Sequence, residues 1–108
     1  MDMFAMIGTY ESDPFVSVHL TEKYALIAAI RDVMDFLGVA DCDDEEDFKG
    51  RFAFDEEVLE GLIRDTEVLD GMQAPQLRPV FRAWANLEGV WDNCQGYSIT
   101  VVKTRVQA

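Results

Sequence analysis

The sequence predicts an α+β fold, in which a three-stranded antiparallel sheet, made of an N-terminal hairpin and a C-terminal strand, packs with about three helices. Stretches of alternating β-branched and aromatic residues lie near both ends of the chain. Between them, apolar residues recur at the three- and four-residue spacing of amphipathic helices. The 108 residues, of which 49% are hydrophobic, suffice for one real core, so we expect residues 1–108 to form a single compact domain.

Strands are predicted at residues 3–10 and 15–20, which are rich in β-branched and aromatic side chains, with turn-forming residues 11–14 between them. A closing strand is predicted over residues 97–106, where it should pair with the hairpin. In the second strand, alternation places one set of side chains in the core and leaves the other set partly exposed. The two sets are Val16, Val18 and Leu20, and Phe15, Ser17 and His19.

A helix is predicted from Glu22 to Leu37. Thr21 can cap its first turn, because the threonine hydroxyl can accept a hydrogen bond from an otherwise unpaired backbone N–H. Gly38 suits the left-handed position that ends a helix, and Val39 supplies the apolar residue that commonly follows. The apolar stripe of this helix should pack on the sheet and comprises Leu26, Ile27, Ile30, Val33, Met34 and Leu37.

Two further helices are predicted. The first begins at Asp55, a good N-cap whose neighbour Phe54 can pack on Leu59, and its buried side comprises Val58, Leu59, Leu62 and Ile63. The second spans residues 77–89, with Pro79 tolerated in its first turn. Along one side of it, and more typical of a core than of a ligand-stacking site, lie Val80, Trp84, Leu87 and Trp91.

Charge is the most distinctive property of the chain. The net charge is −12, and residues 41–70 alone hold thirteen carboxylates against three basic side chains, a local charge of −10. Phe48, Phe52 and Phe54 lie inside this region, which is untypical of a disordered acidic tail and indicates that the acids are displayed on a folded surface. The candidate partner-binding residues are Asp41, Asp43, Asp44, Glu45, Glu46, Asp47, Asp55, Glu56, Glu57 and Glu60.

Motifs for catalysis and for metal binding are not found in the sequence. In a calcium-loop reading that starts at Asp41, Glu46 replaces the required glycine and Phe52 replaces the bidentate glutamate. His19 is the only histidine, and neither Cys42 nor Cys94 has a neighbour at zinc-ligand spacing. The glycines form no phosphate-binding loop. We therefore expect no enzyme, catalytic residue, metal or cofactor.

The same charge disfavours direct binding to nucleic acid, because the nine basic residues are dispersed and outnumbered by acids. The charge fits better with binding to another protein that itself binds nucleic acid. Duplex DNA carries one charge per about 1.7 Å of axis, and a folded surface with ten or so carboxylates approximates that density. The chain would then occupy a basic DNA-binding surface of another protein, with fast, electrostatically steered association.

A chain of this length, with an N-terminal hairpin FAMIGTYESDPFVSV, a helical middle, a closing YSITVV strand and an acidic face, resembles the small proteins encoded by bacteriophages and mobile elements. It is most similar in character to DNA-mimicking anti-CRISPR proteins, which occupy the DNA-binding channel of a Cascade-type complex or of a Cas nuclease. The resemblance implies an inhibitor of a CRISPR effector. The alternative is a non-catalytic interaction or adaptor domain of cytosolic or phage origin, whose acids only solubilise it.

The remaining expectations concern compartment and assembly. No segment has the pattern of a signal peptide or a membrane span, which favours a cytoplasmic protein, in the bacterial host if the gene is phage-encoded. Cys42 and Cys94 are too few for a secreted disulfide scaffold and are expected to be free thiols. We expect a monomer or a small homo-oligomer.

The cysteines provide a direct test of the compartment. In a reducing cytoplasm Cys42 and Cys94 form no intramolecular disulfide. Thiol titration of the native, unreduced protein should therefore find both groups free. Finding neither would contradict both the redox state and the cytoplasmic location.

Overall fold

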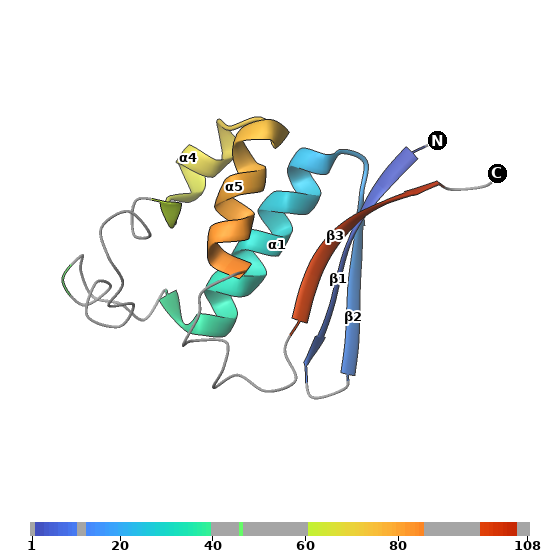
Figure 1. Ribbon diagram of the computed structural model, residues 1–108, viewed down its shortest axis with the longest axis horizontal. Helices are drawn as coiled ribbons and strands as arrows, with labels where there is room; N and C mark the ends of the chain where they lie inside the picture. The colour runs from blue at the N-terminus through green and yellow to red at the C-terminus, as the bar shows by residue number, and fades with distance from the viewer. Residues whose placement is uncertain (1, 11–12, 40–45, 47–60, 86–97, 106–108) are drawn as a thin grey trace.

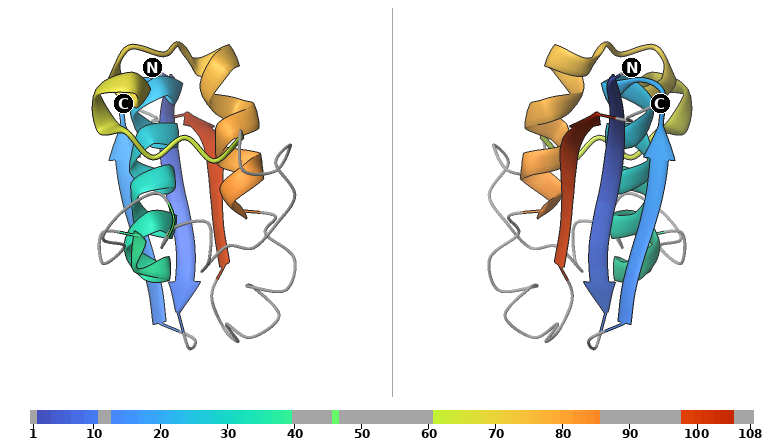
Figure 2. Two further views of the ribbon diagram at one scale, coloured as in Figure 1. Left: turned by 90° about the vertical axis from the view of Figure 1, so that its left-hand side faces the viewer. Right: turned by 90° about the vertical axis from the view of Figure 1, so that its right-hand side faces the viewer.

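The computed structural model describes residues 2–10, 13–39, 46, 61–85 and 98–105. In this part of the chain a three-stranded antiparallel sheet forms one layer and the helices form a second layer on one of its faces (Figures 1 and 2). The predicted α+β class is confirmed. The elements are β1 (Asp2–Tyr10), β2 (Asp13–His19), α1 (Glu22–Leu37), α4 (Thr66–Asp70), α5 (Ala74–Ala85) and β3 (Ser98–Arg105).

The strand order is β2-β1-β3. The closing strand therefore pairs with the hairpin, as predicted, and the structure shows that it pairs with the first strand, which is the central one. Ala5 lies opposite Val18 of β2 and Val102 of β3, while Gly8 lies opposite Phe15 and Ile99. Because directly paired residues of antiparallel strands point to the same side, this register defines two faces. The inner face, toward the helices, includes Met6, Gly8, Phe15, Ile99 and Val101.

The register also decides which set of β2 side chains is exposed. Val16 and Val18 are 63% and 53% exposed, and Leu20, directly after the strand, is 69% exposed. The other set, Phe15, Ser17 and His19, is half-buried. The aliphatic set therefore lies on the face that the described helices leave uncovered, and the set with two polar members faces the interior.

Helix α1 has the predicted bounds and caps. The Thr21 hydroxyl accepts a hydrogen bond from the backbone N–H of Tyr24 at 3.3 Å. Gly38 adopts a left-handed φ of 71°, and its N–H donates to the Asp35 carbonyl at 3.2 Å. The buried side chains of α1 comprise five of the six predicted stripe residues, with Leu37 partly buried, and are Ala25, Leu26, Ile27, Ala29, Ile30, Val33 and Met34.

Helix α5 begins earlier than predicted. It starts at Ala74 rather than at residue 77, because the Gln76 side chain accepts from the Gln73 N–H at 2.9 Å and so caps the first turn. Pro75, not Pro79, occupies that turn. Pro79 lies in the helix interior, where it has no N–H to donate to the carbonyl four residues earlier. The predicted continuation to residue 89, with Leu87 and Trp91, lies outside the described residues.

The short helix α4 was not predicted. Asp65 caps it by accepting from the Glu67 N–H at 2.9 Å, and Leu69 anchors it with no exposed surface. The helix predicted to begin at Asp55 falls mostly on residues 55–60, outside the described residues, as do Cys42 and Cys94. Residues 62–65 are not helical, although Leu62 is buried as expected.

The core lies between α1, α5 and the inner face of the sheet. Trp84, Ile30, Leu69, Leu77 and Val33 are its largest fully buried side chains. Trp84 Nε1 donates to the Ile63 carbonyl at 3.0 Å, which satisfies the indole where no water reaches it. This full burial supports the structural interpretation of Trp84 over a ligand-stacking one.

Gly8 offers a sharp test of the sheet packing. A Cβ atom there would lie 2.3 Å from Phe15 Cζ and 2.6 Å from the Ser98 carbonyl oxygen, so the Phe15 ring covers the bare backbone. We expect Gly8→Ala to lower the free energy of unfolding by about 1–3 kcal/mol through overpacking, measured by urea denaturation followed by circular dichroism.

The matched control is Gly71→Ala. Gly71 has a φ of −83°, and an added Cβ would lie 3.6 Å from its nearest neighbour, the Val68 carbonyl oxygen. This change should be neutral or should stabilise the protein by about 0.4–1 kcal/mol, because alanine restricts the unfolded chain. Equal effects of the two substitutions would contradict the close packing at Gly8.

Candidate functional site

Of the ten acidic residues predicted to bind a partner, one lies among the described residues. Glu46 is described, and it is exposed. The other nine candidate partner-binding residues lie outside the described residues, namely Asp41, Asp43, Asp44, Glu45, Asp47, Asp55, Glu56, Glu57 and Glu60.

The described end of the acidic region is α4 with its cap. Asp65, Glu67 and Asp70 are all exposed there. The buried Leu69 side chain attaches this turn to the core, and Asp70 Oδ1 lies 3.4 Å from Arg31 Nη2 of α1. In this segment, therefore, the carboxylates are held at defined positions on a folded surface. The aromatic residues among the acids predicted such a surface for residues 41–70 as a whole.

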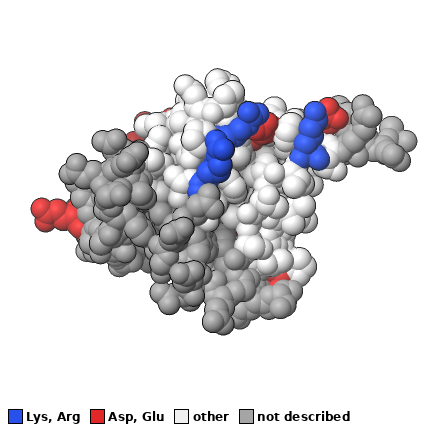
Figure 3. All heavy atoms as spheres, viewed as in Figure 1, with Lys and Arg blue, Asp and Glu red and all other residues white. Residues whose placement is uncertain are grey.

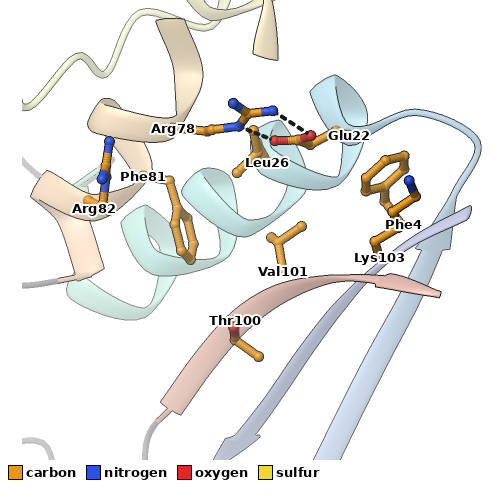
Figure 4. Close-up of a pocket in the computed structure, with 9 residues that line it drawn as sticks. All are labelled: Phe4, Glu22, Leu26, Arg78, Phe81, Arg82, Thr100, Val101 and Lys103. Carbon is orange, nitrogen blue, oxygen red and sulfur yellow. Dashed lines mark hydrogen bonds and ion pairs between the residues drawn. The ribbon is translucent and has the colours of Figure 1, made fainter. Parts of the chain in front are cut away.

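An open groove of about 580 Å³ lies between α1, α5 and the sheet (Figure 4). Its apolar wall is formed by Phe4, Leu26, Phe81 and Val101, and its charged rim by Glu22, Arg78, Arg82 and Lys103, with Thr100 at the edge. Phe81 and Val101 point toward each other across it, whereas Thr100 points to the opposite side of β3. The combination of an apolar wall and a net positive rim suits an amphipathic anion.

The rim charges are partly paired with one another. Arg78 Nε donates to Glu22 Oε1, and Arg78 Nη2 donates to Glu22 Oε2 at 2.9 Å, so the guanidinium binds the carboxylate through two hydrogen bonds (Figure 4). Lys103 Nζ lies 3.3 Å from Asp2 Oδ2. Among the described residues Arg82 forms no ion pair, and it is the cation left available at the rim.

This pairing shifts two pKa values. The hydrogen bonds from Arg78 lower the pKa of Glu22 below its ordinary 4.5, against a smaller opposing effect of burial. The same hydrogen bonds raise the pKa of Arg78. The ion pair fixes α5 to the first turn of α1, where a carboxylate is also favoured by the helix dipole.

In the sequence the basic residues are dispersed along the chain. The structure brings three of them, Arg78, Arg82 and Lys103, to one groove. Figure 3 shows one group of basic side chains over α5 and a separate one over β3, on the same side of the molecule. Arg78 and Arg82 are four residues apart on α5. Because residues at this spacing are neighbours on a helix surface, the predicted helix could have indicated that the two side chains lie side by side. Lys103 joins them only because β3 pairs with β1 beneath the helices.

The sheet face opposite the helices is the second notable surface, and Figure 2 (right) shows it uncovered by the described helices. We call it the open sheet face. By register it comprises Met3, Ala5, Ile7, Thr9, Pro14, Val16, Val18, Ser98, Thr100, Val102 and Thr104. None of these side chains is charged, although the whole chain carries −12.

Comparison with known proteins identifies no relative. No protein-family model, curated protein sequence or solved structure significantly matches the chain. Over the described ranges, no three His, Cys, Asp or Glu side chains come together as a metal site. In the same part of the chain, no helix has the length and apolar character needed to cross a bilayer.

The Glu22–Arg78 pair predicts a pH-dependent stability difference. Because folding lowers the pKa of Glu22, its contribution is fully present above the unfolded value of 4.5 and is lost as the pH falls through the folded value. The parent should therefore melt at a higher temperature than Glu22→Gln at neutral pH, and the two melting temperatures should converge as the medium is acidified below 4.5.

The control places Glu22→Gln in an Arg78→Gln background. There the pH-dependent difference should shrink, since only the helix-dipole effect on Glu22 remains. If the difference persists at full size without Arg78, the ion pair is not its cause.

Proposed function

We propose that this protein is a non-catalytic inhibitor that binds the basic, nucleic-acid-binding surface of another protein through its acidic region. The observation that carries the proposal is the concentration of charge, −10 within residues 41–70 out of −12 for the whole chain. The described end of that region supports it, because α4 presents Asp65, Glu67 and Asp70 to solvent on a turn anchored by Leu69.

The physical basis is competition with DNA for the same cations. A protein that binds DNA releases counterions by placing Lys and Arg against closely spaced phosphates. Carboxylates fixed on a folded domain offer those side chains an alternative set of anions without the entropic cost of ordering a flexible tail. Net charge of this magnitude also steers the encounter with a basic surface and raises the association rate.

The first candidate partner is a CRISPR effector complex, because the chain resembles DNA-mimicking anti-CRISPR proteins in charge and size. Bound at the DNA channel, the protein would block loading of target DNA. It would contact no nucleic acid itself, since its surface charge repels phosphate.

A second candidate function is a non-catalytic adaptor domain, which the exposed aliphatic side chains of the open sheet face favour. The two functions differ in salt dependence. An acidic inhibitor binds its partner less tightly as salt is raised, whereas an adaptor that uses apolar contacts is nearly insensitive to salt.

The decisive variant neutralises Asp43, Asp44, Glu45, Glu46 and Asp47 to Asn and Gln. Each rim charge contributes about 0.5–1 kcal/mol to a steered complex, so the five changes should weaken binding by roughly two to four orders of magnitude, mostly through the on-rate. Stability should be unchanged or slightly higher, because crowded like charges repel. The measurement is DNA loading on a purified Cascade-type effector complex, read by gel shift over a salt series.

The matched control neutralises the five acids of residues 1–40 other than Glu22, which changes the net charge by the same amount. These are Asp2, Glu11, Asp13, Asp32 and Asp35. This variant should block DNA loading far better than the first. If the variant neutralised at residues 43–47 still blocks loading as well as the parent does, inhibition through the acidic region is wrong.

A further inference from the structure

The groove beside α5 follows from the way the helices are layered. Helix α1 contacts all three strands, whereas α5 makes most of its contacts with α1. Figure 2 (left) shows α5 beside the edge strand β3. The space that remains between these elements is the groove of about 580 Å³ (Figure 4). Sites for small molecules typically measure about 300–1,000 Å³, whereas a protein partner needs about 800 Å² of surface on each side. The groove therefore has the dimensions of a small-molecule site.

We propose that this groove binds a small monocarboxylate with an apolar body, of which a medium-chain fatty acid is the simplest example. The carboxylate would lie against the arginines of α5, and the apolar body would lie along the wall between Phe81 and Val101. The proposal does not depend on the inhibitor function, because the groove residues that carry it all lie outside residues 41–70.

The wall of the groove can bury an apolar ligand. Leu26 is its most buried member, at 4% exposed, and forms the floor. Phe81 and Val101 are partly buried and pack against the core, and Phe4 is partly buried on β1. These side chains are held in place by the fold and still keep apolar surface in contact with water. Removing that surface from water is what favours an apolar ligand.

The charges at the rim leave one positive charge for a ligand. The positive side chains are Arg78, Arg82 and Lys103, and the negative ones are Glu22 and Asp2, which lies beside Lys103. In the described part of the chain Arg82 is the rim cation that forms no ion pair. A ligand with a single negative charge neutralises this surplus. Phosphate esters and nucleic acids are disfavoured, because they carry more charge and the whole chain carries −12.

The rim already binds one carboxylate, that of Glu22. It accepts hydrogen bonds from Nε and Nη2 of Arg78 (Figure 4). A guanidinium has five N–H donors, and the Arg78 side chain is 52% exposed, so it keeps donors for a second carboxylate. Because Arg82 lies one turn further along α5, a ligand carboxylate between the two arginines can contact both. Glu22 then competes with the ligand for Arg78.

The test is a titration of the full chain with octanoate, followed by calorimetry and by amide NMR spectra. The dissociation constant should be roughly 0.1–1 mM, as expected for a ligand of this size in an open groove. Amide resonances of Leu26, Phe81 and Val101 should shift, and those of Val16 and Val18 on the open sheet face should not.

Two related ligands separate the contributions of chain and charge. Hexanoate should bind more weakly than octanoate, by about two- to fourfold for each methylene removed, because less apolar surface is buried. Octanol has the apolar chain without the charge, and it should bind about two- to fivefold more weakly than octanoate.

The first variant is Arg82→Gln, which removes the unpaired cation. It should weaken octanoate binding by about two- to fivefold and, since Arg82 is exposed, should fold normally. The matched control is Arg31→Gln on α1, which changes the net charge equally. Arg31 Nη2 lies 3.4 Å from Asp70 Oδ1, outside the groove, so the control should leave the dissociation constant unchanged.

The second variant should change the affinity in the opposite direction. Glu22→Gln removes the competing carboxylate from Arg78, so octanoate should bind about two- to fivefold more tightly. The control is Glu67→Gln on α4, which changes the net charge equally away from the groove. A merely structural role of Glu22 would give weaker or unchanged binding, so the sign of the effect decides. Circular dichroism at the titration temperature checks that each variant is folded.

Absence of octanoate binding would overturn the proposal, as would equal affinities for octanoate and octanol. Equal effects of Arg82→Gln and Arg31→Gln would overturn it too, because the rim cation would then have no part in binding. Resonance shifts confined to the open sheet face would place the ligand elsewhere and would likewise contradict the site. The DNA-loading assay measures the acidic region separately from all of these results.

Discussion

Burial of the apolar stripe of α1 is the interaction on which the rest of the described structure depends. Ile30 and Val33 are fully buried, and α1 contacts α5 and all three strands. Leu77 and Trp84 of α5 complete the same core. Because the helix has one broad apolar side, it can pack against the inner face of the sheet and against a neighbouring helix at the same time. The Glu22–Arg78 pair and the Trp84–Ile63 hydrogen bond then fix the arrangement at its polar margins.

This two-layer arrangement separates three kinds of surface. The described helices all lie on one face of the sheet, so the opposite face keeps its aliphatic side chains exposed. Acidic side chains are displayed on α4, and basic ones surround the groove beside α5 and β3. An inhibitor that binds through its acidic region would therefore leave the open sheet face and the groove uncovered.

The elements that local sequence explains were predicted well. Thr21 and Gly38 fix the ends of α1 through hydrogen bonds to their own neighbours, which need no tertiary contact. The start of α5 was misplaced because two prolines are each compatible with a first turn, and the Gln76 side chain selects Pro75. Helix α4 was missed because five residues are too short to show a helical period, and Asp65 was its only local signal.

The sequence by itself determined the fold class, the bounds of α1 and the concentration of acids in residues 41–70, because periodicity, capping and charge are properties of neighbouring residues. Alternation in β2 also separated Val16, Val18 and Leu20 from Phe15, Ser17 and His19. Only the tertiary structure decided which set faces solvent, since that depends on the side of the sheet to which α1 returns. In the same way it brought Lys103 to Arg78 and Arg82, because strand pairing joins residues that are far apart in the chain.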